Sequence, residues 1–160
     1  MCCAKEAAQQ SVHSPGRVAD SETVGYALLD PDNWRDGKLL NAAFSRTRLR
    51  ACDLSIYRVE SSTAAMILEK VVSPQLQRNQ SRSFAGVLRA LCADIRACRD
   101  QSTNDRQFCV VDDGLDGFES HALLGFSEST AGASSNLQTA ARANLVAVFG
   151  GDGSIATNLP

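Results

Sequence analysis

The chain has 160 residues, of which 44% are hydrophobic and 21% are charged, so its composition is that of one globular domain and not of a disordered or collagen-like chain. A formal net charge of −2 argues against a protein that coats nucleic acid by electrostatic attraction. No window approaches the ~20 consecutive apolar residues that a membrane-spanning helix needs. The polar N-terminus lacks the apolar stretch of a secretory signal, and we therefore predict a cytoplasmic protein.

The six cysteines form an even count, which suits a disulfide framework in an exported protein. Because we predict a cytoplasmic location, where disulfides are rare, we expect these thiols to be reduced. No two of them stand in a Cys-x-x-Cys arrangement. We predict that most of them act as small buried hydrophobic groups, and we predict no metal and no cofactor.

The predicted elements begin after a loose N-terminal arm, residues 1–20, which is rich in Ala, Gln and Ser. A strand is expected over residues 24–29, followed by a turn at residues 30–33, where Asp, Pro and Asn are typical turn formers. Basic residues then alternate with other residues over 44–50. A second strand is expected over residues 54–59, because their composition favours β-structure.

Two helices are expected next. The first covers residues 64–72 and ends before Pro74, because proline interrupts a helix. Residues 73–82 are polar and are expected to be a loop. The second helix covers residues 83–99, where apolar residues recur with a helical period at Phe84, Val87, Leu88, Leu91, Ile95 and Cys98.

The last part of the chain is expected to contain a hairpin and a helix. Strands at residues 107–112 and 118–126 are joined by residues 113–117, whose Asp and Gly favour a hairpin loop. An amphipathic helix is expected over residues 136–148, and residues 151–160 are expected to be a flexible tail.

This order of strands and helices predicts one small α+β domain over residues 21–150. Its sheet is expected to be mainly antiparallel and to be packed by two to three amphipathic helices. No internal repeat indicates a second copy of any element.

The predicted hairpin contains a candidate catalytic pair. If the hairpin is symmetric about residue 115, Cys109 faces His121, and Val111 faces Glu119 on the same side of the sheet. A cysteine beside a histidine and a carboxylate could be a nucleophile or could bind a metal. A shift of one residue in the register removes the pair, and we favour the alternative of a hydrogen-bonded structural histidine.

Arginine dominates the cationic residues, since only three of the 16 are lysines. Four of the arginines lie close together in the sequence, namely Arg46, Arg48, Arg50 and Arg58. An extended chain would place the first three on one face. Arginine binds phosphates and carboxylates through paired hydrogen bonds, so this group predicts an anion-binding pocket. The alternative is a solvated surface balanced by the 18 Asp and Glu residues.

Residues 57–69 read Tyr-Arg-Val-Glu-Ser-Ser-Thr-Ala-Ala-Met-Ile-Leu-Glu. This segment resembles the strand-to-helix segment of the RES-domain toxins, which degrade NAD. The matching residues are Tyr57, the pair Glu60 and Ser61, and Glu69 on an expected helix that also carries Ala65. The resemblance implies roles for Tyr57, Glu60 and Glu69 at an NAD-degrading site. Glu69 lies one position later than the family's catalytic acid, and Lys38 stands where the family has arginine.

Two functions are compatible with these features. No complete catalytic constellation emerges from the sequence, which favours a non-enzymatic binding or assembly module of a bacterial multi-protein system, with a protein partner or a second copy of itself and with no membrane partner. The alternative is a small enzyme that acts on a nucleotide or NAD-like, phosphate-bearing substrate through the arginines. Its candidate catalytic residues are Tyr57, Glu60, Glu69, Cys109 and His121.

Overall fold

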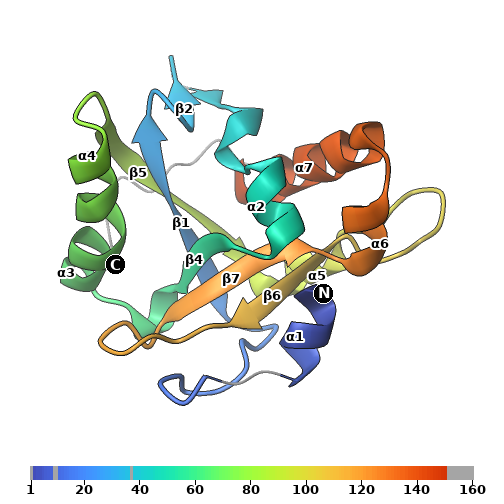
Figure 1. Cartoon of the computed structure of the whole chain (residues 1–160), viewed down its shortest axis with the longest axis horizontal. Helices are drawn as coiled ribbons and strands as arrows, with labels where there is room; N and C mark the ends of the chain where they lie inside the picture. The colour runs from blue at the N-terminus through green and yellow to red at the C-terminus, as the bar shows by residue number, and fades with distance from the viewer. Residues whose placement is uncertain (1, 9–10, 37, 151–160) are drawn as a thin grey trace.

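A five-stranded antiparallel sheet forms the centre of the computed structural model, which describes residues 2–8, 11–36 and 38–150. The strands lie across the sheet in the order β5 (Ser83–Leu91), β1 (Thr23–Asp30), β4 (Leu54–Arg58), β7 (His121–Phe126) and β6 (Phe108–Asp112). A separate ribbon pairs β2 (Trp34–Arg35) with β3 (Lys38–Leu39). The predicted α+β class and antiparallel sheet are confirmed (Figure 1).

Most of the helices between these strands are short. The α-helices are α1 (Cys2–Ala8), α2 (Arg46–Ala51), α3 (Ala64–Ile67), α4 (Ser73–Arg78), α5 (Cys92–Ala97), α6 (Glu128–Gly132) and α7 (Ser135–Gly150). A π-helix and two 3-10 turns complete them, at η3 (Leu68–Val72), η1 (Asn41–Ala43) and η2 (Val59–Ser61). Among the described residues, no helix has the length and apolar character needed to cross a membrane.

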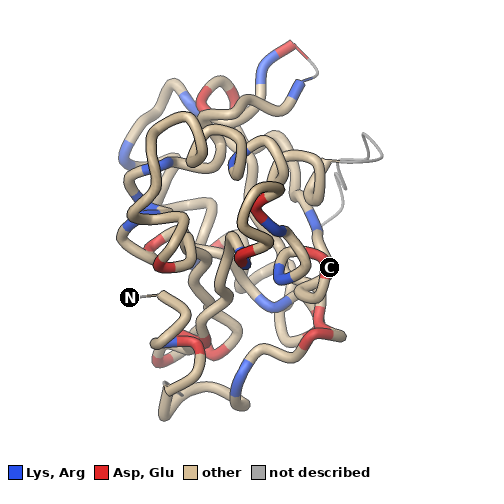
Figure 2. Tube along the Cα trace, turned by 90° about the vertical axis from the view of Figure 1, so that its right-hand side faces the viewer, with Lys and Arg blue, Asp and Glu red and all other residues tan. Residues whose placement is uncertain are grey.

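Each face of the central sheet packs against a different set of helices. One face, with Leu28 and Ile56, buries side chains from α7 and the α2 region, such as Leu145. The continuous stretch α3–η3–α4 covers the other face over Tyr57 and Val87 (Figure 1). Lys and Arg are interspersed with Asp and Glu along the chain (Figure 2), in keeping with the small net charge.

The segment predicted as a helix over residues 83–99 is instead a strand followed by a short helix. β5 pairs with β1 along its length, and Val87 and Leu88 are both buried although a strand points them to opposite faces. Val87 packs in one core and Leu88 in the other. A strand that is buried on both faces has no strict alternation of apolar and polar residues, so its pattern resembles that of a helix.

The predicted loop at residues 73–82 is also wrong, because its first half is helix α4. Pro74 is the second residue of α4 and directly follows the π-helix η3, where the regular hydrogen bonding between residues four apart is already interrupted. The π-helix η3 joins α4 to α3 without a break. The predicted end of the helix before Pro74 is therefore a junction inside one helical stretch.

Helix α1 forms within the segment predicted as a loose arm, and two disulfides tie it to the end of α2 and to β6. Cys2 is bonded to Cys52, and Cys3 is bonded to Cys109, with Cα atoms 5.4 and 5.1 Å apart. The expectation of reduced thiols is wrong for these four residues. Disulfides are typical of oxidising compartments, so the cytoplasmic location stays a prediction that they do not support. The predicted tail at residues 151–160 lies outside the described residues.

A buried carboxylate on α1 adds to this attachment. Glu6 accepts hydrogen bonds from the Arg96 and Arg106 guanidinium groups, at 2.7 and 2.8 Å, and from the backbone N–H of Val110 at 3.1 Å. Burial alone would raise the pKa of Glu6, but the hydrogen bonds and charges of the two arginines outweigh it, and the pKa is lowered from 4.5. Glu6 therefore stabilises the fold as an anion.

We expect the contribution of Glu6 to stability to be present at neutral pH and to disappear in acid. A carboxyl whose pKa is lower in the folded state stabilises it above the unfolded-state pKa, and this stabilisation is lost as the pH falls through the folded-state pKa. Glu6→Gln should therefore lower the free energy of unfolding by roughly 1.5–3 kcal/mol at pH 7, the range for hydrogen bonds to charged groups. Urea unfolding between pH 7 and pH 3 should show the gap between wild type and variant narrowing below pH 4.5. A gap that stays constant with pH would contradict this expectation.

Candidate functional site

The candidate site lies where two neighbouring strands separate. β1 and β4 pair only at Val24 with Arg58 and at Gly25 with Tyr57. β1 then continues to Asp30 while it is paired with β5 alone. A Cβ atom on Gly25 would lie 2.3 Å from the Tyr57 ring, so only glycine allows the ring to lie against β1 at the last pair.

A cleft of about 650 Å³ opens beyond this last pair. β1, β4, α2 and α4 all contribute side chains to its walls. Most of these side chains are polar, among them Tyr26, Ser45, Arg48, Ser55, Arg78 and Arg82. Pockets for small molecules span about 300–1,000 Å³, so the cleft has the size of a ligand site.

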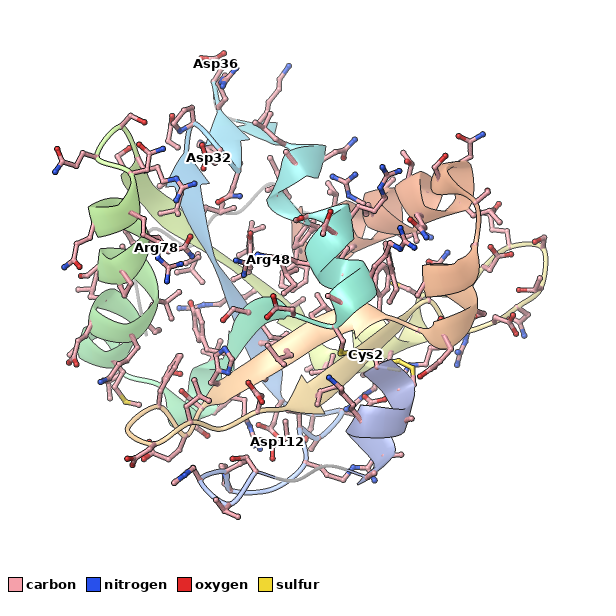
Figure 3. All side chains as sticks on the ribbon, in the orientation of Figure 1. Cys2, Asp32, Asp36, Arg48, Arg78 and Asp112 are labelled. Atoms are coloured by element: carbon pink, nitrogen blue, oxygen red, sulfur yellow. A yellow bond between two sulfur atoms is a disulfide. The ribbon has the colours of Figure 1, made fainter. Side chains whose placement is uncertain are left out.

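Three arginines line the cleft from two sides. Figure 3 shows Arg48 of α2 and Arg78 of α4 pointing into the space between these helices. Arg82 is held by an ion pair with Asp32 at 2.5 Å. Within residues 2–8, 11–36 and 38–150, the guanidinium groups of Arg48 and Arg78 make no hydrogen bond or ion pair. Two positive charges therefore stand in the cleft without a protein counterion.

Only one of the four predicted anion-binding arginines lines this cleft. The segment around Arg48 is helix α2 and not the extended chain that would align it with Arg46 and Arg50, because Ser45 caps the helix by accepting from the Arg48 N–H. Each residue of a helix is turned by about 100° from the last. Arg46 and Arg50 therefore share one face, while Arg48 faces the cleft.

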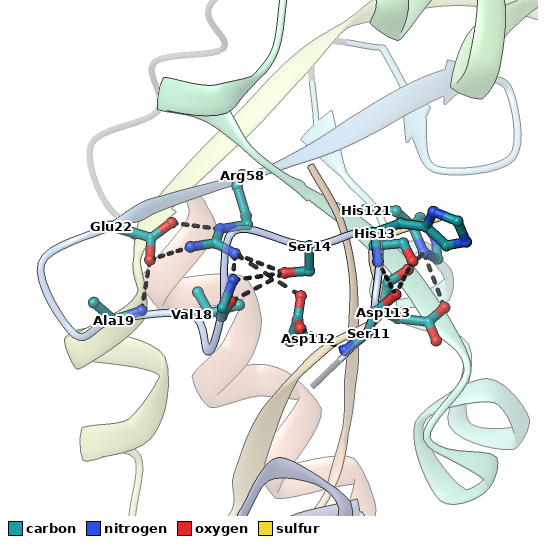
Figure 4. Close-up of polar contacts among 12 residues, drawn as sticks. Ser11, His13, Ser14, Val18, Ala19, Glu22, Arg58, Asp112, Asp113 and His121 are labelled. Carbon is teal, nitrogen blue, oxygen red and sulfur yellow. Dashed lines mark hydrogen bonds and ion pairs between the residues drawn. The ribbon is translucent and has the colours of Figure 1, made fainter. Parts of the chain in front are cut away.

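Arg58 is buried in the protein interior, away from the cleft. Its guanidinium group forms an ion pair with Glu22 at 2.5 Å and donates to the Gly16 carbonyl at 2.7 Å, with Asp112 at 3.8 Å (Figure 4). These partners belong to the protein itself and neutralise the positive charge of Arg58. The prediction that Arg58 binds an anionic ligand is therefore wrong, and its role is structural.

A serine, a histidine and an aspartate form a chain of contacts beside the cleft. Ser55 Oγ lies 2.6 Å from His121 Nε2, and His121 Nδ1 lies 3.0 Å from both Asp113 Oδ2 and the Asp113 carbonyl oxygen. Ser55 pairs with Leu123 in the sheet, so His121 is its diagonal neighbour on the same face. The Phe118 ring packs 5.5 Å from the imidazole and helps to fix it.

The predicted pair of Cys109 and His121 does not form. In the hairpin, Cys109 pairs with Gly125, and β7 begins only at His121, so the turn is longer than a hairpin symmetric about residue 115. Cys109 instead forms the disulfide with Cys3. The ligand atoms of Cys3, Cys109 and Glu128 lie within 4.8 Å of one another, but sulfur atoms joined in a disulfide are not thiolate ligands.

The residues that resemble the RES-domain toxins do not come together. Tyr57 is fully buried, and burial raises the pKa of its hydroxyl. Glu60 accepts from the Thr23 N–H at 3.0 Å, which joins η2 to the start of β1. Glu69 is exposed and pairs with Lys70 at 2.9 Å. These three side chains do not form a shared site.

Comparison of the chain with protein-family models, with curated proteins and with solved structures found no match. The cleft must therefore be interpreted from its own residues. Four residues of the site were not predicted from the sequence, namely Ser55, Arg78, Arg82 and Asp113. The four-residue spacing of Arg78 and Arg82 was visible, but it lay in a segment predicted as a loop.

Proposed function

We propose that this protein is a small enzyme that binds a phosphate-bearing small molecule in the cleft between β1 and β4. The observation that carries the proposal is the pair of guanidinium groups, Arg48 and Arg78, that project into one polar cleft without a protein counterion. Arginine binds phosphate through paired hydrogen bonds, and both side chains are exposed and therefore accessible to a ligand. The bacterial origin and the protein partner expected from the sequence stay predictions.

Other residues of the cleft support a fixed binding geometry. Burial raises the pKa of Tyr26 to about 12, so its hydroxyl stays protonated and donates to the Ala43 carbonyl at 2.6 Å. This bond ties β1 to the turn that precedes α2, and Ser45 then caps the helix that carries Arg48. The ion pair with Asp32 holds Arg82 on the same wall. These contacts fix the backbone that carries Arg48 and the side chain of Arg82, which lowers the entropy cost of binding at these two positions.

Substitution of either unpaired arginine is expected to weaken phosphate binding. Pyrophosphate is a suitable probe, and we expect Arg48→Ala and Arg78→Ala each to raise its Kd roughly tenfold or more, since a hydrogen bond to a charged group contributes about 1.5–3 kcal/mol. Isothermal titration calorimetry at low salt measures this change.

Arg46→Ala is the matched control, because Arg46 is an exposed arginine on another face of the same helix. It should leave the Kd unchanged. Wild-type protein that does not bind pyrophosphate, or an Arg46→Ala variant that binds as weakly as Arg48→Ala, would contradict the proposal.

A further inference from the structure

We propose that Ser55 is the nucleophile of an ester-hydrolysing site, with His121 as its general base and Asp113 as the positioning residue that orients the imidazole. The substrate class is a carboxylic ester that carries an anionic group. The requirement for an anionic group on the ester rests on the proposed function, because the arginines of the cleft would hold that group. The hydrolytic chemistry rests on separate observations.

The first observation is the direction of each hydrogen bond. The Asp113 carbonyl oxygen, 3.0 Å from His121 Nδ1, can only accept a hydrogen bond. Nδ1 therefore carries the proton, and in the neutral imidazole the lone pair lies on Nε2. Ser55 Oγ, 2.6 Å from Nε2, must then be the donor. This is the protonation pattern in which a histidine removes a proton from a serine nucleophile.

The second observation is access. Ser55 lines the cleft, while His121 is only 8% exposed and lies behind it. A substrate in the cleft therefore reaches the hydroxyl, and the base is shielded from bulk water. Ser45 also lines the cleft, but its hydroxyl caps α2 and has no histidine partner among the described residues.

The third observation is a backbone donor beside the nucleophile. Arg58 N–H donates to the Ser120 carbonyl, on the β7 side of β4. Because backbone groups alternate along a strand, the Ser55 N–H points to the opposite side, toward β1. The ladder between β1 and β4 ends at Gly25 and Tyr57, so this N–H has no ladder partner among the described residues and faces the cleft. A backbone N–H in this place stabilises the negative charge on an attacked carbonyl oxygen.

The proposed reaction has two half-steps. Ser55 Oγ forms a bond to the ester carbonyl carbon, its proton passes to His121 Nε2, and the carbonyl electron pair moves to oxygen. The bond from this carbon to the alcohol oxygen then breaks, and the leaving alcohol takes the proton from His121. Water repeats the sequence on the acyl-serine, which releases the carboxylic acid and restores the Ser55 hydroxyl. No oxidation or reduction occurs in either half-step.

Labelling with a neutral alkyl fluorophosphonate tests the nucleophile directly. Attack by Ser55 forms an O–P bond, releases fluoride and transfers the proton to His121. We expect peptide mass spectrometry to find the label on Ser55 and not on Ser45, which shares the cleft. His121→Gln should slow labelling by 10²-fold or more, the typical contribution of a general base, and Ser55→Ala should abolish it. Absence of label on Ser55, or equal labelling of the two serines, overturns the inference.

The role of Asp113 has its own readout. Asp113→Asn removes the carboxylate but keeps the backbone carbonyl that accepts from Nδ1, so we expect ¹⁵N NMR of the His121 ring to show the Nδ1–H tautomer in wild-type protein and in this variant. The ¹H resonance of Nδ1–H should move upfield in Asp113→Asn, because the charge-assisted hydrogen bond to the carboxylate is lost, and labelling of Ser55 should slow. Circular dichroism shows whether the variant is folded. An unchanged Nδ1–H resonance and labelling rate in a folded Asp113→Asn variant overturn the positioning role.

The substrate class is tested with two chromogenic esters, 4-nitrophenyl hemisuccinate and 4-nitrophenyl butyrate. Wild-type protein should hydrolyse the anionic ester with a higher kcat/KM, and Arg48→Ala should lose this preference. Equal rates with both esters overturn the substrate class. Labelling of Ser55 in wild-type protein that does not bind pyrophosphate would refute only the proposed function, whereas pyrophosphate binding without labelling would refute only the Ser55 site.

Discussion

Reduction of the two disulfides is expected to lower the free energy of unfolding by several kcal/mol. The bonds close loops with sequence separations of 50 and 106 residues. Restriction of the unfolded chain by loops of this length is worth roughly 4 kcal/mol for each bond in the chain-entropy account. Urea unfolding with and without dithiothreitol measures the change, and reduced protein should unfold at a much lower urea concentration.

The cysteines outside the disulfides provide the control for this experiment. Cys98 is a free, partly buried thiol, so Cys98→Ala should keep the sensitivity to dithiothreitol. A variant with both Cys2→Ser and Cys3→Ser should start at the stability of reduced wild type and no longer respond to the reductant. Six titratable thiols in unfolded, non-reduced wild type would contradict the two bonds.

Arg58→Ala is expected to cost about 3–5 kcal/mol of stability, the range for breaking a buried ion pair by removing one partner. The Arg58 side chain is 6% exposed, and Asp112 beside it is 1% exposed. Asp112 Oδ1 has no hydrogen-bond partner among the described residues, so the Arg58 charge is its main compensation. Without Arg58, the Asp112 carboxylate stays buried without a charge partner, and the partly exposed Glu22 loses its ion pair. Thermal or urea unfolding of the variant measures the loss.

Two further variants show whether burial is the cause. Arg58→Lys keeps the charge but not the forked contact with Glu22, and it should lie between wild type and Arg58→Ala. Arg50→Ala removes an exposed arginine from α2 and should change stability by no more than about 0.5 kcal/mol. Equal losses in Arg58→Ala and Arg50→Ala would contradict the structural role of Arg58.

Local sequence patterns were sufficient to predict the strands whose ends are marked by turns. β4 and β6 lie within the predicted ranges, β1 extends one residue beyond its predicted range at each end, and α7 covers the last predicted helix. β5 could not be distinguished from a helix, because burial on both faces of the sheet depends on β1 and on two separate cores. The position of Pro74 at the start of α4 similarly depends on how the π-helix before it is packed.

The candidate site was harder to predict because it depends on registers between distant segments. Ser55 and His121 meet only through the pairing of β4 with β7, and they lie 66 residues apart in the sequence. A hairpin assumed symmetric about residue 115 placed His121 opposite Cys109 instead. The arginines could be recognised as a group, but the cap at Ser45, which makes their segment helical, decides that Arg48 alone faces the cleft.

Helix α1 has one more consequence, which concerns association between molecules. β6 is the last strand of the sheet, and the N–H of Val110 points outward, away from β7. An outer strand with free backbone groups can add a strand from another chain and so begin aggregation. Glu6 occupies this N–H, and the bond between Cys3 and Cys109 fixes α1 along the same strand (Figure 1). Helix α1 thus acts as a cover that keeps the sheet from growing beyond its own chain at the β6 edge.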